Sequence, residues 1–206
     1  MIKRVLLITC LLLLTSCNMY TINNLPLEEI INRNIASINE LDNVNNKGYR
    51  YYLPVGFNIE LDEDYNQVII SKGNKYYLNI DIVSYYYKNE MTTSSSPNDY
   101  KFYKFNNKEK TGYLKIIKNN DNFFIELCYN YAIIEVEVEE KDINYAVSRS
   151  ISILNSIKYN DLVISNIIGN NEIDSSETIY EIPSPENKDD SKNILEYIEP
   201  SQLKDE

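Results

Sequence analysis

The sequence predicts an α+β fold: an antiparallel meander sheet of about six strands, with one amphipathic helix before the sheet and another after it. Two observations carry this prediction. Apolar residues recur at helical spacing in residues 25–41 and 141–157, whereas residues 49–139 alternate between apolar and polar side chains. Short polar turns separate the alternating runs, and such turns join antiparallel neighbours because parallel strands need longer crossovers.

The first predicted helix begins at Leu25–Glu29, with Asn24 as its cap. A proline suits the first turn, and two glutamates favour the positive end of the helix dipole. The polar run 42–48 ends the helix. Its apolar stripe is Leu27, Ile30, Ile31, Ile35, Ile38 and Leu41.

The predicted strands are separated by hairpin turns at residues 71–75, 106–110 and 119–122. Glutamates at 135, 137 and 139 alternate with valines, which indicates a strand with one wet face and one buried face. The predicted strands are Tyr49–Leu53, Gln67–Ser71, Lys75–Tyr87, Lys101–Phe105, Gly112–Lys118 and the long stretch Phe123–Glu139.

The second predicted helix spans Lys141–Ile157. Its stripe is Ile143, Ala146, Val147, Ile151, Leu154 and Ile157. Periodicity leaves open whether the two helices cover one face of the sheet or opposite faces. We expect a single domain over residues 25–169, a length that suits one core and not two.

The N-terminal residues predict an export signal. Lys3 and Arg4 precede the apolar run Val5–Leu14, which is too short to span a bilayer as a helix. The segment Leu14-Thr15-Ser16-Cys17 that follows resembles the bacterial lipobox. This resemblance implies that residues 1–16 are a cleaved signal peptide, that Cys17 carries the lipid (a diacylglyceryl group and palmitate-type acylation), and that residues 18–24 are a tether. The expected location is the extracytoplasmic face of the cell membrane.

The charge of the chain limits its partners. The chain has 20 basic and 31 acidic side chains, a net charge of −11, and loss of Lys3 and Arg4 takes it to −13. An acidic protein repels phosphate backbones and anionic lipid surfaces, so we expect no nucleic-acid partner. Attachment to the membrane must then come from the lipid.

Residues 170–206 form an acidic segment with three prolines and no long apolar periodicity, which predicts a disordered tail. Eleven acids and three bases give this segment a net charge of −8. The runs Ile179–Ser184 and Tyr197–Ser201 echo each other, each with an aromatic, an aliphatic and an acidic residue before Pro-Ser. Two interpretations stay open: a pair of docking motifs, or recurrence by chance in a biased composition.

Two short motifs flank the predicted sheet. Leu53-Pro54-Val55-Gly56-Phe57 and Ile153-Leu154-Asn155-Ser156-Ile157-Lys158 resemble the start and finish of the PsbP/Mog1-type α/β/α sandwich. The resemblance covers residues 49–159. It implies a binding or assembly-assisting module, and it carries no catalytic residues over to this chain.

The residue types argue against catalysis. The chain has no histidine, which removes Ser-His-Asp, Cys-His and histidine-based zinc sites. Cys10 leaves with the signal and Cys17 is lipidated, so Cys128 is the one remaining thiol and no internal disulfide can form. Cys128 lies in an alternating strand, where a buried, inert thiol is expected. We therefore expect no enzyme, no catalytic residues and no cofactor.

Two weak binding candidates remain. Asp62, Asp64 and Asn66 match the first positions of an EF-hand-like calcium loop, but Gln67 and Gly73 stand where that loop needs glycine and glutamate. A solvated acidic turn is the alternative. The tyrosine runs 51–52, 76–77 and 85–87 predict one ring in the core and one outside per pair, since strand neighbours face opposite sides. The outer rings could bind glycan or a protein, although AT-rich codons alone favour tyrosine.

These observations together predict a lipid-anchored, non-catalytic binding or assembly module whose partner is an envelope protein. The alternative is a module for a small ligand, either cell-wall glycan or calcium.

Overall fold

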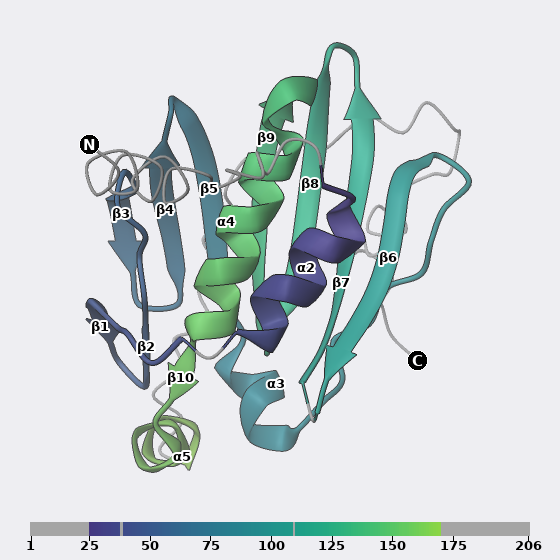
Figure 1. Ribbon diagram of the computed structural model, residues 1–206. Coiled ribbons are helices and arrows are strands. Elements are labelled where there is room, and N and C mark those ends of the chain that lie inside the picture. Colours follow the sequence, from purple (N-terminus) through teal and green to yellow (C-terminus); the bar gives the residue numbers. More distant parts are fainter. Residues whose placement is uncertain (1–24, 38, 109, 170–206) are drawn as a thin grey trace, which may run out of the picture.

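The computed structural model describes residues 25–169 except 38 and 109, and its centre is a seven-stranded antiparallel sheet with the order β3-β4-β5-β9-β8-β7-β6 (Figure 1). This arrangement confirms the α+β fold with helices before and after the sheet, and adds one strand to the expected count. The strands are β3 (Asn58–Glu63), β4 (Asn66–Ser71), β5 (Asn74–Ile80), β6 (Asp99–Asn107), β7 (Lys110–Asn119), β8 (Asn122–Tyr129) and β9 (Ala132–Glu139).

Helix α2 (Leu27–Ala36) is shorter than its apolar pattern predicted. Pro26 takes the capping position, and the chain turns extended at Ser37. Ile30, Ile31 and Ile35 are buried, as predicted, but Leu41 is 64% exposed and lies beyond the helix. The predicted cap Asn24 and stripe residue Ile38 lie outside the described residues.

Left-handed residues make the hairpin turns. Lys72 and Gly73 have φ values of 50° and 80° between β4 and β5, and Asn120 has 54° between β7 and β8, which confirms two predicted turns. Asn130 and Tyr131, at 54° and 61°, form a further two-residue turn. The predicted long strand Phe123–Glu139 is therefore a hairpin, because two successive left-handed residues reverse the chain.

The predicted strand Lys75–Tyr87 is wrong beyond Ile80. There the chain enters helix α3 (Ile82–Tyr87), which begins where the Asp81 carboxylate accepts a hydrogen bond from Ser84 N at 2.8 Å. The helix ends at Lys88, which is left-handed. The tyrosines of this run favour strands by propensity, but the aspartate cap and the ring stack of Tyr85 on Tyr159, with centroids 3.9 Å apart, prevail.

Helix α4 (Ile143–Ser156) follows a 3₁₀ turn, η2 (Glu140–Asp142), and confirms the second predicted helix. Its stripe is buried against the sheet, and α2 packs beside it. Both helices lie on the same face of the sheet (Figure 1), which answers the question that periodicity left open. The main core fills the space between this helix pair and the inward side chains of β5, β9, β8 and β7.

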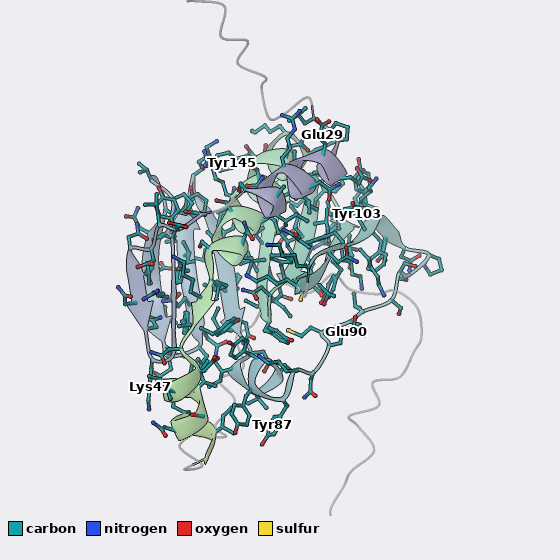
Figure 2. The ribbon with its side chains drawn as sticks, turned by 60° about the horizontal axis from the view of Figure 1, so that its bottom comes forward. Glu29, Lys47, Tyr87, Glu90, Tyr103 and Tyr145 are labelled. Carbon is teal, nitrogen blue, oxygen red and sulfur yellow. The ribbon has the colours of Figure 1, made fainter. Side chains whose placement is uncertain are left out.

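Several short elements escaped prediction. Strands β1 (Val44–Asn46) and β10 (Lys158–Tyr159) and the helix α5 (Asp161–Gly169) were not predicted. The predicted strand Tyr49–Leu53 is present as β2 (Tyr49–Tyr51), but it pairs with β1 and β10 in a second, small sheet and does not join the main one. Edge strand β3 was also missed, because all of its side chains except Ile59 are exposed. Helices α3 and α5 contact each other beyond one end of the sheet. Figure 2 places Glu29 of α2 at one end of the molecule and Lys47 and Tyr87 at the other.

Candidate functional site

The face of the sheet that points away from α2 and α4 is here called the outer face, and neither of these two helices covers it. Its buried side chains stand apart from the main core: Val68, Tyr113, Phe124 and Cys128. Around them lie the half-buried apolar side chains of Tyr77, Ile117 and Ile133. The outer face is therefore mixed, with apolar and polar side chains side by side.

Two glutamates oppose each other at the centre of the outer face. Glu126 of β8 and Glu135 of β9 are direct partners in the antiparallel register. The Tyr113 hydroxyl donates a hydrogen bond of 2.5 Å to Glu126 Oε1. Burial, and then the nearby charge of Glu126, raise the pKa of Glu135 to about 7. This pair is thus placed to hold a proton near neutral pH.

The basic side chain nearest in register does not neutralise the pair. Lys115 of β7 is the cross-strand partner of Glu126, but its Nζ lies 4.0 Å from Asp99 Oδ1. Glu137, the next outward residue of β9, accepts a hydrogen bond of 3.3 Å from the Asn119 side chain. Within residues 25–169, as far as the structure describes them, no salt bridge reaches Glu126, Glu135 or Glu137.

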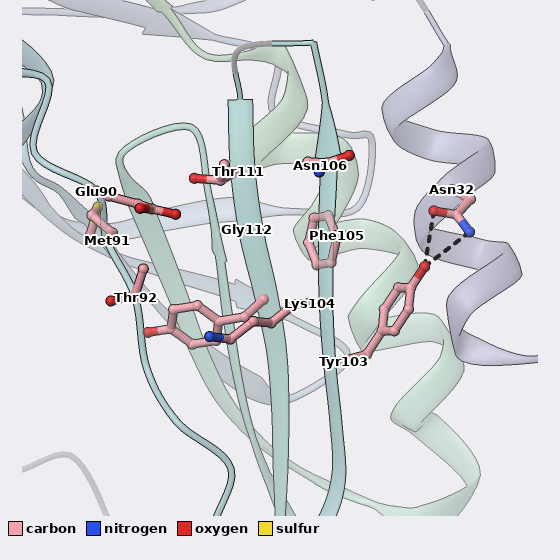
Figure 3. Close-up of a pocket in the computed structure, with 11 residues that line it drawn as sticks. Asn32, Glu90, Met91, Thr92, Tyr103, Lys104, Phe105, Asn106, Thr111 and Gly112 are labelled. Atoms are coloured by element: carbon pink, nitrogen blue, oxygen red, sulfur yellow. Dashed lines mark hydrogen bonds between the residues drawn. The ribbon is translucent and has the colours of Figure 1, made fainter.

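A pocket of about 380 Å³ borders the outer face at the β6–β7 edge (Figure 3). The segment Glu90–Thr92 forms one side, and the two strands form the other. Asn32 of α2 donates to the Tyr103 hydroxyl at 3.2 Å. The remaining lining is a mixture of rings, amides and one lysine: Lys104, Phe105, Asn106, Thr111, Gly112 and Tyr113. Rings beside amides can hold a sugar or a small polar ligand.

A second pocket of similar volume lies between β1, β2, β10 and the start of α5. Its charged groups are engaged in the fold. Arg50 and Lys158 both pair with Asp42, at 3.3 and 3.2 Å, and Asp161 accepts a hydrogen bond of 2.6 Å from the Tyr85 hydroxyl. The charged groups that line this pocket therefore stabilise the small sheet and the start of α5.

The predicted calcium ligands fall on the β3–β4 hairpin, and two of them are engaged. Asp62 accepts hydrogen bonds from the Gln67 and Asn46 side chains at 2.7 and 3.3 Å. Asn66 accepts one from Asn79 at 2.5 Å. Among the described residues, no group of three His, Cys, Asp or Glu side chains is arranged to hold a metal.

Cys128 has the environment that the strand pattern predicted. Its side chain is 1% exposed on the outer-face side of β8, and burial raises the pKa of its thiol to about 12. A thiol that stays protonated is a poor nucleophile. Cys128 therefore has a packing role beneath the outer face.

The tyrosine pairs divide as predicted on strands but not in the last run. Tyr76 is buried and Tyr77 half-buried, on opposite faces of β5. In contrast, Tyr85, Tyr86 and Tyr87 lie on α3, with Tyr87 60% exposed. The expected aromatic surface therefore does not form one row.

The two motifs that resemble the PsbP/Mog1 type meet in the fold. Tyr52 N, just before the first motif, donates to Ser156 Oγ at 2.9 Å, and Ser156 in turn donates to Ile153 O at 2.7 Å. Phe57 N donates to Pro54 O, which forms the turn before β3. These residues join the sheet to α4, and their role in this structure is packing.

Cys17, the tether 18–24 and the two echoing runs of residues 170–206 lie outside the described residues. None of the described helices has the length and apolar character needed to cross a membrane. The Glu126–Glu135 pair was missed because the Asn130-Tyr131 turn was missed. Once that turn is placed, a two-residue hairpin fixes which residues face each other.

The sequence matches no protein-family model, and it shows no significant similarity to any curated protein. The function must therefore be argued from the residues and surfaces described above.

Proposed function

We propose that this chain is a lipid-anchored, non-catalytic binding module on the extracytoplasmic face of the cell membrane, which holds an envelope protein against the outer face of its sheet. The observation that carries the proposal is the placement of α2 and α4 on the same side. Sheets usually bury an apolar face, and the outer face keeps half-buried apolar side chains without a described helix over them.

The size of the outer face suits a protein partner. Seven strands spaced about 4.8 Å apart, each about eight residues long, give a face of roughly 800 Å². Stable protein interfaces bury about 800 Å² on each partner. Tyr77 and Ile133 supply apolar anchors near its centre, where interface energy concentrates, and Ile117 extends the apolar surface toward the β6 edge.

Photo-crosslinking in intact cells tests this proposal. A photoreactive amino acid at Tyr77 or Ile117 lies on the outer face, whereas one at Arg33 or Leu162 lies on exposed parts of α2 and α5. We expect both outer-face positions to give an adduct with the same protein and the two control positions to give none. Adducts only from Arg33 or Leu162 would place the binding surface elsewhere.

A second candidate function, small-ligand binding, is favoured by the pocket at the β6–β7 edge. Its lining combines the rings of Tyr103 and Tyr113 with the amides of Asn32 and Asn106. A ligand that binds only the folded chain raises its melting temperature. A rise with muropeptides that Asn106→Ala abolishes would support this function, and an unchanged melting temperature would remove it.

A further inference from the structure

The glutamate pair at the centre of the outer face lacks a counter-charge. Glu126 and Glu135 face each other across β8 and β9, and like charges directly opposite destabilise a strand pair. The Tyr113 hydroxyl satisfies only one oxygen of Glu126. A cation between the two carboxylates would remove the repulsion and would be bound by both.

The lysines of the outer face contact groups other than Glu126 and Glu135. Lys75 pairs with Glu60 at 2.8 Å, and Lys115 is directed toward Asp99. Lys104 lies toward the ring of Phe102, with its Nζ 5.9 Å from the ring centroid. None of these three lysines on the described outer face therefore neutralises the pair.

We propose that a lysine or arginine side chain of the protein partner binds between Glu126 and Glu135, at the centre of a basic and apolar surface that covers the outer face. This inference rests on the proposed function and adds the chemistry of the partner. Two carboxylates suit an arginine fork or a lysine ammonium, while Tyr77, Ile117 and Ile133 require apolar contacts around the charge.

Charge excludes the other occupants of this face. Residues 170–206 carry a net charge of −8, so this segment of the same chain is repelled by the pair. A second copy of the chain that bound through the same face would bring its own Glu126 and Glu135 toward this pair, and the like charges would repel. An anionic lipid surface is repelled for the same reason.

A peptide-binding experiment with the purified full chain tests the inference. The probe is a short fluorescent peptide of alternating leucine and lysine, and its counterpart alternates leucine and glutamate. We expect the lysine peptide alone to bind, and the double variant Glu126→Gln, Glu135→Gln to weaken its affinity about tenfold or more. The variant removes a repulsion and keeps the side-chain shapes, so it should fold.

The matched control separates a site from general attraction. Glu29→Gln with Glu40→Gln makes the same change in net charge away from the outer face, because Glu29 lies on α2 and the backbone carbonyl of Glu40 accepts a hydrogen bond from Lys158. Equal weakening in both double variants, or equal binding of the glutamate peptide, would overturn the inference. A dimer seen by sedimentation that the Glu126→Gln, Glu135→Gln variant abolishes would also overturn the inference, because a second copy would then occupy the face. Tighter peptide binding after truncation at Gly169, if the same variant loses it, would overturn the inference in favour of residues 170–206.

The pH dependence gives an independent readout. Side chains of four strands surround Glu135 on the outer face. They are Glu126 and Phe124 of β8, Tyr77 and Lys75 of β5, Tyr113 and Lys115 of β7, and Glu137 of its own strand β9. The pKa of Glu135 is raised to about 7, so this carboxyl group changes charge between pH 6 and pH 8. The lysine peptide should bind more tightly at pH 8 than at pH 6, and Glu135→Gln should remove this difference in affinity. A difference of the same size in the variant would contradict the site.

Crosslinking from Tyr77 in the double variant distinguishes the two proposals. An adduct that disappears in the Glu126→Gln, Glu135→Gln background supports the cationic contact. An adduct of undiminished yield would overturn the cationic contact and leave the proposed function standing. Absence of an adduct from the unaltered outer face would overturn the proposed function itself.

Discussion

At the scale of single residues, the fold leaves Glu135 in an unfavourable state at neutral pH. Its carboxyl group is half-buried in β9, opposite Glu126, and no described salt bridge offsets its charge. The raised pKa, from an ordinary 4.5 to about 7, expresses this cost as retention of a proton. Binding sites often keep such unfavourable groups because the partner satisfies them.

Replacement of Glu135 by glutamine should stabilise the protein at pH 8. The folded chain binds the proton more tightly than the unfolded chain, so the free energy of unfolding falls as pH rises from about 4.5 to 7. Glutamine removes this loss. We expect Glu135→Gln to gain about 1–2 kcal/mol at pH 8, a value reduced for the partial exposure of the group.

Urea unfolding at pH 8 and at pH 4 measures the effect of Glu135→Gln. The gain should vanish at pH 4, where both forms of the chain hold the proton. A variant that is less stable at pH 8, or equally stabilised at both values, would contradict the assigned environment.

At the scale of elements, sequence patterns predicted those helices and turns whose signals lie close together in the chain. The stripe of α4 and the turns at residues 72–73 and 120 were found because their signals lie within a few residues. Strand β3 was missed because, with five of its six side chains exposed, it presents little contrast between its two faces. Helix α3 was missed because its residues favour strands and its stability comes from contacts such as Tyr85 on Tyr159, far apart in the chain.

The candidate site was less accessible to prediction than the fold. Alternation showed that Glu135 and Glu137 lie on a strand with one wet face, but not what that face opposes. Pairing with Glu126 depends on the register of the hairpin, and a shift of one residue would turn every side chain to the other face. The position of both helices on one face depends on packing in three dimensions.

Gly112 allows β6, β7 and β8 to pack closely. A Cβ at this position would collide with the Cys128 carbonyl oxygen and lie 2.8 Å from the Phe105 ring. Since the obstacle includes backbone, we expect Gly112→Ala to destabilise the protein by about 2–3 kcal/mol. Urea unfolding measures this, and Gly169→Ala, where the space is open, should change little. Equal effects of both variants would refute the close packing.

Ser156 joins the end of α4 to the chain after β2. Its buried hydroxyl accepts from Tyr52 N and donates to Ile153 O. Ser156→Ala leaves the half-buried Tyr52 N–H without its acceptor, which should cost about 1–3 kcal/mol. The control is Ser165, whose hydroxyl makes a solvent-exposed hydrogen bond to Leu162 O, and its replacement by alanine should cost much less. Chemical denaturation compares the two, and a neutral Ser156→Ala would show that this contact contributes nothing to stability.

At the scale of the whole molecule, both edges of the sheet discourage pairing with another strand. Edge strands β3 and β6 each contain an irregular register, at Ile59/Leu61 and at Asp99/Lys101. Both carry charged side chains, and bulges with charges are how sheets block edge-to-edge association. The edges are protected in this way and the outer face is not, which agrees with the proposed recognition of a partner through that face.

In the proposed function a lipid anchor sets the location of the molecule, and Cys17 is the residue expected to carry it. Seven residues, 18–24, span at most about 25 Å, so the proposed lipid at Cys17 would hold the start of α2 near the membrane. We expect Cys17→Ala to block signal processing and to release the folded domain from the membrane, because an acidic surface gives no other attraction to lipid. Membrane fractionation and the mass of the chain measure both effects. Cys128→Ala, which leaves the lipobox intact, is the control and should remain membrane-bound at the processed mass. If the Cys17→Ala chain were instead cut as usual and retained on the membrane, the anchor would have to lie elsewhere, and the outer face would lose its expected orientation toward envelope partners.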